Sequence, residues 1–271
     1  MCQTLGVSKT QYYHWLKQPV GVRHQRNEDM DDMIKLIFHE HRGRYGSTRI
    51  QQELKARGYA CTREYISSRM RINGLYARAK HKFKVTTDSR HHYSVAPNLL
   101  KQDFTTQKRD EKWLTDITYI PTREGWLYLC VFMDLYSRAV IGWSMSHRLK
   151  HELVTDALQM TLFRRGFARD VIVHSDRGVQ YSCDAYQQLL KDNYLICSMS
   201  GKGCCYDNAP VESFFHSLKV ELVHDEQYQT REEAKSSLID YIECYYNRKR
   251  RHSAIDYQYP IEREMQYQYA A

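Results

Sequence analysis

Three acidic residues stand where the sequence predicts strands to end or helices to begin. Asp176 follows the apolar run 171–173, which predicts a buried strand, and strand C-terminal ends are where open α/β sheets place their chemistry. Glu212 lies in the first turn of a helix for which residues 207–210 are a start signal. Asp116 interrupts a β-rich apolar run, where a charged side chain indicates a ligand.

Three carboxylates are a suitable ligand set for hard divalent cations such as Mg²⁺. Two such ions, about 3.5–4 Å apart, stabilise the attacking and leaving oxygens of an in-line phosphoryl displacement. On the predicted helix, Glu212, His216 and Lys219 share one face, so an imidazole and a cation accompany one carboxylate. These residue types predict metal-dependent phosphoryl transfer.

The residues around the three acids resemble the motifs of a known recombinase family. The motifs are WLTDITYI from residue 113, HSDRGVQY from residue 174 and DNAPVESFFHSLK from residue 207. They resemble a DDE core with 35 residues between its second Asp and its Glu. In wording and order they are similar to the OrfB-type insertion-sequence transposases of the IS-three family, relatives of retroviral integrases. The likeness extends from about residue 28 to residue 262.

The resemblance implies a fold, a reaction and a set of partners. The implied fold is α/β, a ribonuclease-H-like mixed five-stranded sheet with flanking helices, preceded by a small all-α helix-turn-helix module. Asp116, Asp176 and Glu212 would hold two Mg²⁺ or Mn²⁺ ions, with Asp116 bridging them, and Lys219 would hold DNA near the scissile phosphate. The enzyme would cut the element's end and use the freed 3′-OH to attack another phosphodiester. The implied partners are element ends and target DNA, further copies of the chain on that DNA, and an upstream-frame protein or a fusion with it.

The distribution of charge predicts a nucleic-acid-binding N-terminal part. The net charge is +8, and residues 1–102 hold 19 Lys and Arg against 8 Asp and Glu, whereas the remainder holds 21 against 24. This is the pattern of a basic module joined to an acidic-centred enzyme; the alternative is that the cations only solvate helices. No apolar run is long enough to span a membrane and no signal sequence follows Met1, so we expect a cytoplasmic, nucleoid-associated protein without a membrane partner.

The eight cysteines do not indicate a metal site. They form no C-x-x-C pair, and no cysteine pair follows His91 and His92 at finger spacing. A structural zinc ion is therefore not expected.

The first two predicted segments are residues 1–27 and 28–76. A short helix capped at Ser8 is either the tail of a helix-turn-helix that begins upstream or a simple amphipathic helix. Residues 28–76 predict a helical DNA-binding module, with a capping box at Thr48 and a cap at Thr62, although a generic three-helix bundle has the same pattern. Three arginines lie on the helix that would enter a major groove: Arg63, Arg69 and Arg71.

Three further segments complete the chain. Residues 77–102 predict a basic linker that tracks phosphates or is a solvated tether; its candidate DNA contacts are Lys80, Lys82 and Lys84. Residues 103–222 predict the catalytic core: three antiparallel strands, then helix, strand, helix, strand, helix. Lys202, beside its Gly-rich loop, is a further candidate DNA contact. Residues 223–271 predict a helix and a basic tail whose arginines bind phosphate or answer the helix dipole; they are Arg248, Arg250 and Arg251.

Two interpretations concern residues outside the acid set. Asp134 resembles a strand-ending turn with an Asp–Arg contact more than a catalytic acid. Trp113, Trp126 and Trp143 are expected in the core and not on base-stacking surfaces.

Two other functions share parts of these patterns: a catalytically silent DNA-binding regulator of transposition, and a ribonuclease-H-like nuclease that stops at hydrolysis.

Overall fold

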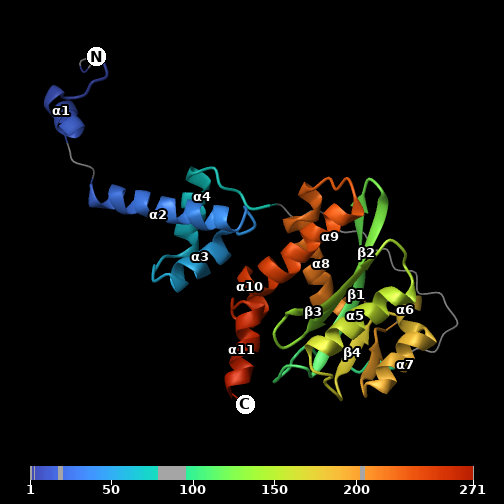
Figure 1. Ribbon diagram of the computed structural model, residues 1–271. Coiled ribbons are helices and arrows are strands. Elements are labelled where there is room, and N and C mark those ends of the chain that lie inside the picture. Colours follow the sequence, from blue (N-terminus) through green and yellow to red (C-terminus); the bar gives the residue numbers. More distant parts are fainter. Residues whose placement is uncertain (1, 3, 18–20, 79–95, 202–204, 271) are drawn as a thin grey trace. The chain divides into compact units, whose positions relative to one another are not determined.

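The computed structural model describes residues 2, 4–17, 21–78, 96–201 and 205–270. The chain divides into two compact units, residues 1–78 and residues 79–271 (Figure 1). Lys80, Lys82, Lys84 and Lys202, four of the predicted DNA contacts, lie outside the described residues.

The N-terminal unit is all-helical in its described part. It consists of α1 (Lys9–Lys17), α2 (Val22–Glu40), α3 (Ser47–Ala56) and α4 (Arg63–Ile72). Helix α1 has no buried residue. Helices α2, α3 and α4 enclose one core because their apolar side chains recur at helical spacing, and its fully buried members include Ile34, Ile37, Ile50, Leu54 and Ile66.

Two predicted helix caps have different outcomes. Thr62 Oγ1 accepts a hydrogen bond from the Tyr65 N–H at 3.3 Å, which confirms the cap of α4. The capping box at Thr48 is wrong: α3 begins one residue earlier, with Gly46 as a cap that supplies no side chain. Gln51 instead donates to the Cys61 carbonyl at 3.0 Å and so ties α3 to the segment that precedes α4.

The second unit is built on a five-stranded mixed sheet, as predicted. Its strands are β1 (Lys112–Thr122), β2 (Gly125–Asp134), β3 (Val140–Ser146), β4 (Ile172–Ser175) and β5 (Ile196–Met199). The spatial order is β3-β2-β1-β4-β5, in which β1, β2 and β3 pair antiparallel, and β4 pairs parallel to both β1 and β5. The parallel pairs require helical crossovers, which α5, α6 and α7 supply.

Helices cover both faces of this sheet (Figure 1). On one face lie α5 (His151–Arg164), α6 (Val179–Ser182) and α7 (Asp184–Asp192), and on the other lie α8 (Ala209–Glu221) and α9 (Arg231–Ile239). Successive residues of β1 alternate between the two resulting cores, because strand side chains point to opposite faces in turn. None of the described helices has the length and apolar character needed to cross a membrane.

Close contact between α5 and β3 depends on a missing side chain. A Cβ atom at Gly142 would lie 2.0 Å from Thr161 Oγ1 and 2.8 Å from the Ala157 carbonyl oxygen. Any larger residue at 142 would therefore push α5 away from the sheet.

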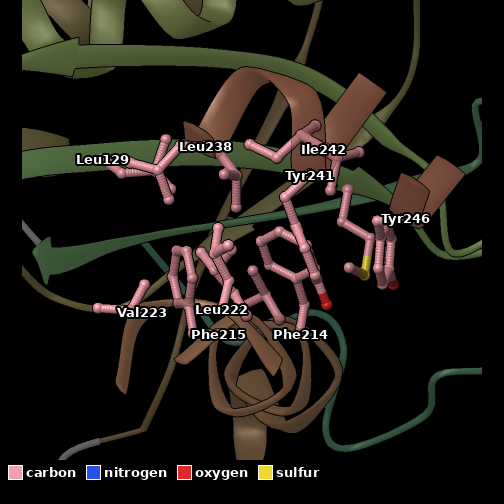
Figure 2. Packing of buried hydrophobic residues seen from close by; sticks show 14 of the residues in the cluster. Leu129, Phe214, Phe215, Leu222, Val223, Leu238, Tyr241, Ile242 and Tyr246 are labelled. Atoms are coloured by element: carbon pink, nitrogen blue, oxygen red, sulfur yellow. The ribbon is translucent and has the colours of Figure 1, made fainter. Parts of the chain in front are cut away.

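The helix predicted within residues 223–271 is interrupted. Helix α9 ends at Ile239, a π-helical turn covers Asp240–Tyr246, and α10 (Asn247–Lys249) follows, before α11 (Pro260–Ala270). The wider turn places four consecutive or near-consecutive side chains in the core: Tyr241, Ile242, Tyr245 and Tyr246. Figure 2 shows Tyr241 and Tyr246 near Phe214 of α8, and the Phe214 and Tyr246 rings meet edge to face, 4.7 Å between centroids.

The last residues of the predicted linker belong to the catalytic unit. Leu100 is buried in the core beneath α8 and α9, and the Leu99 N–H donates to Ser198 Oγ at 2.9 Å. The sequence analysis placed the end of the linker at residue 102, whereas residues 96–102 pack with the second unit. The predicted linker is therefore too long at its C-terminal end. A single buried leucine in a polar stretch carries no periodic signal.

The C-terminal segment is fastened to α8 by a buried ion pair. Arg250 and Glu221 are 3% and 5% exposed, with Arg250 Nη2 2.7 Å from Glu221 Oε1, and Tyr241 donates to Glu221 Oε2 at 2.8 Å. Arg250 also donates to Ser217 Oγ at 3.0 Å. The prediction that Arg250 contacts DNA is therefore wrong, because its guanidinium lies inside the fold with carboxylate and hydroxyl partners.

We expect Arg250→Met to destabilise the protein strongly. The substitution keeps the volume but leaves the Glu221 carboxylate buried without its cation, which costs about 3–5 kcal/mol in comparable pairs. The free energy of unfolding, measured by urea denaturation, is the test. The matched control is Arg248→Met, two residues away and exposed, which should change it by less than about 0.5 kcal/mol. Equal effects of the two substitutions would contradict the assignment.

Candidate active site

The sheet register brings the first two predicted acids together. Strands β1 and β4 pair in parallel with a constant offset, Lys112 with Ile172 through Leu114 with His174. The same offset carried two residues further brings Asp116 level with Asp176. Leu114 packs in the core beneath α8, so Asp116, two residues further along the strand, faces the same side.

The third acid comes from the helix that covers that face. Glu212 lies in the first turn of α8. The start of α8 is fastened to β1 by Asn208, whose Nδ2 donates to the Thr115 carbonyl at 3.1 Å, one residue before Asp116. Asn208 occupies the N-cap position, but its Oδ1 accepts no hydrogen bond from the first turn of α8, and its side chain is held through Nδ2 alone.

The three carboxylates and Lys219 interact electrostatically. Burial raises the pKa of Asp116 well above its usual value, and the negative charges of Asp176 and Glu212 raise it further. The pKa of Glu212 is also raised, first by loss of water and then by Asp176. Burial lowers the pKa of Lys219, and the nearby Asp116 opposes this change. The structure thus brings together the four residues that the motifs indicated.

The acids form an open set of oxygen donors. Glu212 is exposed, whereas Asp116 and Asp176 are half-buried. Backbone N–H groups orient both aspartates: Ile117 donates to Asp116 Oδ1 at 2.8 Å and Gly178 to Asp176 Oδ1 at 2.9 Å. Within the described ranges, no three or more His, Cys, Asp and Glu side chains are arranged to hold a metal ion.

Asp207 is a buried residue of the site that sequence reasoning missed. Its carboxylate is 2% exposed and accepts hydrogen bonds from Asn98 Nδ2 at 2.8 Å, Gln102 Nε2 at 3.1 Å and the Gly201 N–H at 2.7 Å. It therefore fixes two separate segments, residues 98–102 and the residue after β5, to the chain directly before α8, five residues from Glu212. The available signal was its place in the helix-start motif, where an acid is usually explained as a helix cap.

His174 supports the end of β4 as a buried neutral ring. Its Nδ1 lies 2.8 Å from Ser198 Oγ and its Nε2 lies 3.1 Å from Ser200 Oγ. Burial lowers its pKa to about 4, although the charge of Asp207 opposes the change. The ring links β4 to the end of β5, two residues before Asp176.

The arginines of α4 do not share one environment. Arg63 and Arg71 are exposed and line a surface hollow together with Ser67. Arg69 instead pairs with Asp31 of α2, with Arg69 Nε 2.6 Å from Asp31 Oδ1. The prediction that Arg69 contacts DNA is therefore corrected, because this ion pair holds α4 against α2.

The remaining arginines of the C-terminal tail also differ. Arg248 is exposed on α10. Arg251 is half-buried, donates to the Tyr257 carbonyl at 2.9 Å and packs over the Tyr259 ring, 4.7 Å from its centroid. Arg251 thus has local partners, and Arg248 is the tail arginine that faces solvent.

The structure also tests the expectations that Asp134 ends a strand in a turn and that the tryptophans lie in the core. Asp134 Oδ1 accepts hydrogen bonds from the Tyr136 and Ser137 N–H groups, which confirms a strand-ending turn. The Asp134 Oδ2 atom lies 4.0 Å from Arg165 Nη2, directly after α5. Burial raises its pKa to about 6. Trp113 is fully buried, as expected. The expectation for Trp126 is wrong, because its side chain is 52% exposed.

Comparison with known proteins identifies the family of this chain. Residues 106–205 and residues 212–267 each match an integrase core domain, and residues 24–83 match a helix-turn-helix-like domain. Transposase InsF for insertion sequence IS3A of Escherichia coli (strain K12) is 48% identical over 255 residues, 93% of this chain and 88% of InsF. The chain belongs to the IS3 family of insertion-sequence transposases.

Two other similar proteins extend the comparison. The uncharacterized 31 kDa protein of insertion element IS600 from Shigella sonnei is 40% identical over 255 residues, 94% of each chain. Among solved structures, a chain of the simian T-cell lymphotropic virus intasome in complex with PP2A regulatory subunit B56 gamma matches with a TM-score of 0.41 and 13% identity. The match covers 77% of this chain and 67% of that one. The protein is thus a DNA transposase, a polynucleotidyl transferase with a DNA-binding helix-turn-helix-like domain.

Buried His174 makes the transposase less stable in acid. Its pKa of about 4 lies below the usual 6.5, so the unfolded chain binds the proton first as the pH falls. Its contribution is complete above pH 6.5 and declines between pH 6.5 and 4, by about 2 kcal/mol from pH 7 to pH 5. Unfolding free energies at both pH values test this. His174→Gln should remove that part of the pH dependence, while His147→Gln, at an exposed position, should retain it.

Loss of the Asp207 carboxylate should slow DNA joining without weakening DNA binding. Asp207→Ala removes three hydrogen bonds that fix the start of α8, and a displacement of Glu212 by about 1 Å can cost roughly 100-fold in rate. Single-turnover joining rates and gel-shift affinities provide the two measurements. Asn98→Ala removes one of the three donors and should have a smaller effect of the same kind. An unchanged joining rate for Asp207→Ala would refute this role.

Proposed function

We propose that Asp116, Asp176 and Glu212 are the catalytic carboxylates of this transposase and hold two divalent ions, Mg²⁺ or Mn²⁺. The observation that carries the proposal is the electrostatic coupling of these three acids, which come from β1, the end of β4 and the start of α8. Repulsion among like charges is unfavourable unless a ligand offsets it, and such clusters are characteristic of functional sites.

The chemistry of the donor set suits a hard cation, although in the described structure the three side chains are not arranged to hold one. All three ligands are carboxylates, and a divalent charge would offset the burial and the repulsion that together raise the pKa values of Asp116 and Glu212. Because the acids form an open set, DNA phosphate and water would complete the coordination. When bound, the ions would stabilise charge on the attacking and leaving oxygens of an in-line displacement.

The chain's own residues orient the reacting groups. The Ile117 and Gly178 N–H groups fix the orientation of Asp116 and Asp176, and Asn208 fixes the helix that carries Glu212. Lys219, two turns further along α8 and close to Asp116, supplies a positive charge for the phosphate next to the scissile bond. In the first step a water cuts the end of the element, and in the second the released 3′-OH attacks another phosphodiester. Neither step requires a covalent bond to the protein.

Separate basic surfaces would hold the DNA. Arg63 and Arg71 of α4 are exposed in the helix-turn-helix-like domain, where a groove-reading helix is expected. Arg248, with the partly engaged Arg251, would contribute phosphate contacts in the C-terminal tail, and the cations outside the described residues remain further candidates: Lys80, Lys82, Lys84 and Lys202. We further propose that the protein works in the cytoplasm as a homo-oligomer on element ends and target DNA, with the upstream-frame protein or as a fusion with it.

Removal of one carboxylate should abolish chemistry and spare binding. With a plasmid carrying the DNA that flanks this gene, Asp116→Asn, Asp176→Asn and Glu212→Gln should each lower nicking and joining by at least about 100-fold. DNA affinity should stay within about twofold, since binding depends on the separate basic surfaces. EDTA should stop the wild-type reaction, and added Mg²⁺ or Mn²⁺ should restore it.

Asp134→Asn is the matched control for these acids. Asp134 is a buried carboxylate at the end of β2 that serves a turn, so its substitution should alter stability more than the rate of joining. Undiminished strand transfer by Glu212→Gln would contradict the proposal. Nicks without joins in the wild type would favour a nuclease, and DNA binding without any metal-dependent product would favour a regulator.

A further inference from the structure

The β1–β2 hairpin extends past the rest of the sheet beside the active site. Strand β4 ends at Ser175, whose register position corresponds to Thr115, whereas β1 continues to Thr122. Beyond that point one face of the hairpin packs against the core beneath α8 and α9, through Ile120 and Leu127. The opposite face carries three aromatic side chains, which we call the aromatic platform: Tyr119, Trp126 and Tyr128.

The platform is ordered but incompletely covered. The ring of Tyr119 lies between the other two, with its centroid 6.0 Å from Trp126 at an interplanar angle of 89° and 5.1 Å from Tyr128 at 73°. Edge-to-face contacts of this kind stabilise aromatic clusters. About half of the surface of Trp126 is nevertheless exposed to solvent, whereas indole side chains were expected in the core. An exposed, rigidly supported indole is suited to a stacking partner.

The platform borders the acid set without being part of it. Tyr119 follows Asp116 by three residues, about 10 Å along the strand, and points to the opposite face. Burial raises the pKa of the Tyr119 hydroxyl, and Tyr128, Asp176 and Asp116 raise it further. The platform therefore lies within electrostatic range of two of the three acids, Asp116 and Asp176.

The surroundings of the platform are basic. Residues 147–150 leave β3 after Ser146, the register partner of Tyr128, and this segment contributes exposed Arg148 and Lys150. Arg123 is exposed at the turn between β1 and β2. The neighbouring acids have local partners: Glu124 lies 3.9 Å from Arg231, and Glu152 lies 3.7 Å from His151.

We propose that the aromatic platform stacks unpaired bases of the DNA that the enzyme is cutting or joining. Proteins commonly bind single-stranded nucleic acid with aromatic side chains that lie beside a row of cations. The aromatic rings stack on the bases and the cations contact the phosphates. The cations favour this occupant over an apolar protein surface. The location next to the reaction rests on the proposed function of the three acids, but the binding does not depend on their chemistry.

Binding in EDTA to two labelled DNAs separates the platform from catalysis. One is a fully paired duplex, and the other is the same duplex with about three unpaired nucleotides at one end. Trp126→Ala should weaken binding of the frayed DNA by about 5- to 100-fold and leave the duplex affinity unchanged, and Trp126→Phe should retain most of it. The control is Phe163→Ala, an exposed aromatic outside the platform, near the C-terminal end of α5. A second readout is photo-crosslinking of 5-iododeoxyuridine in the unpaired segment to Trp126 or Tyr119.

Each other outcome overturns the inference. Unchanged affinity of Trp126→Ala for frayed DNA, or equal loss for both DNAs, would show that the platform does not select unpaired bases. A change in oligomeric state by size-exclusion chromatography would show that Trp126 contacts a second copy of the chain. Because these measurements exclude metal, failure of the three acids to support strand transfer would leave them unaffected.

Discussion

Mutual repulsion among three carboxylates is the constraint to which the catalytic unit is built. Such charges would separate if each were carried on its own flexible segment. The parallel pairing of β1 with β4 prevents this for Asp116 and Asp176, since their backbone positions are set by sheet register. Glu212 is held by a helix whose first turn is bonded to the strand that carries Asp116. Burial raises the pKa of Asp116, and the charges of Asp176 and Glu212 raise it further.

Apolar burial supplies the free energy that opposes this repulsion. Phe214 and Phe215 of α8 pack with the strands and with the tyrosines of the π-helical turn (Figure 2). The same helix carries Glu212 at its exposed first turn and Glu221 at its buried last turn. The C-terminal segment therefore stabilises the active site from the far end of α8, through the Arg250 ion pair. The catalytic helix is fixed at both ends, by Asn208 and Asp207 at one and by Arg250 at the other.

Sequence reasoning succeeded where a pattern has a single physical explanation. Alternating and apolar runs in residues 103–222 gave the order of strands and helices, and the motifs around the three acids and Lys219 were specific enough to bring four distant residues together. It failed where one residue type serves two purposes. Arg248 and Arg250 are identical in type and two residues apart, yet one faces solvent and the other is buried. Arg63 and Arg69 differ in a similar way, since Arg63 is exposed whereas Arg69 is half-buried and pairs with Asp31.

The sequence by itself determined the class of chemistry, the residues that could perform it and the mixed sheet that carries them, because residue type and periodicity are local properties. Only the tertiary structure decided which polar side chains stabilise the fold and are therefore not available to bind DNA or metal. Arg69 pairs with Asp31, 38 residues away, and Asp207 and Arg250 find their partners in other elements. No local sequence pattern encodes such pairings. Tertiary packing likewise left Trp126 exposed, because the hairpin extends beyond the helices that cover the rest of its face.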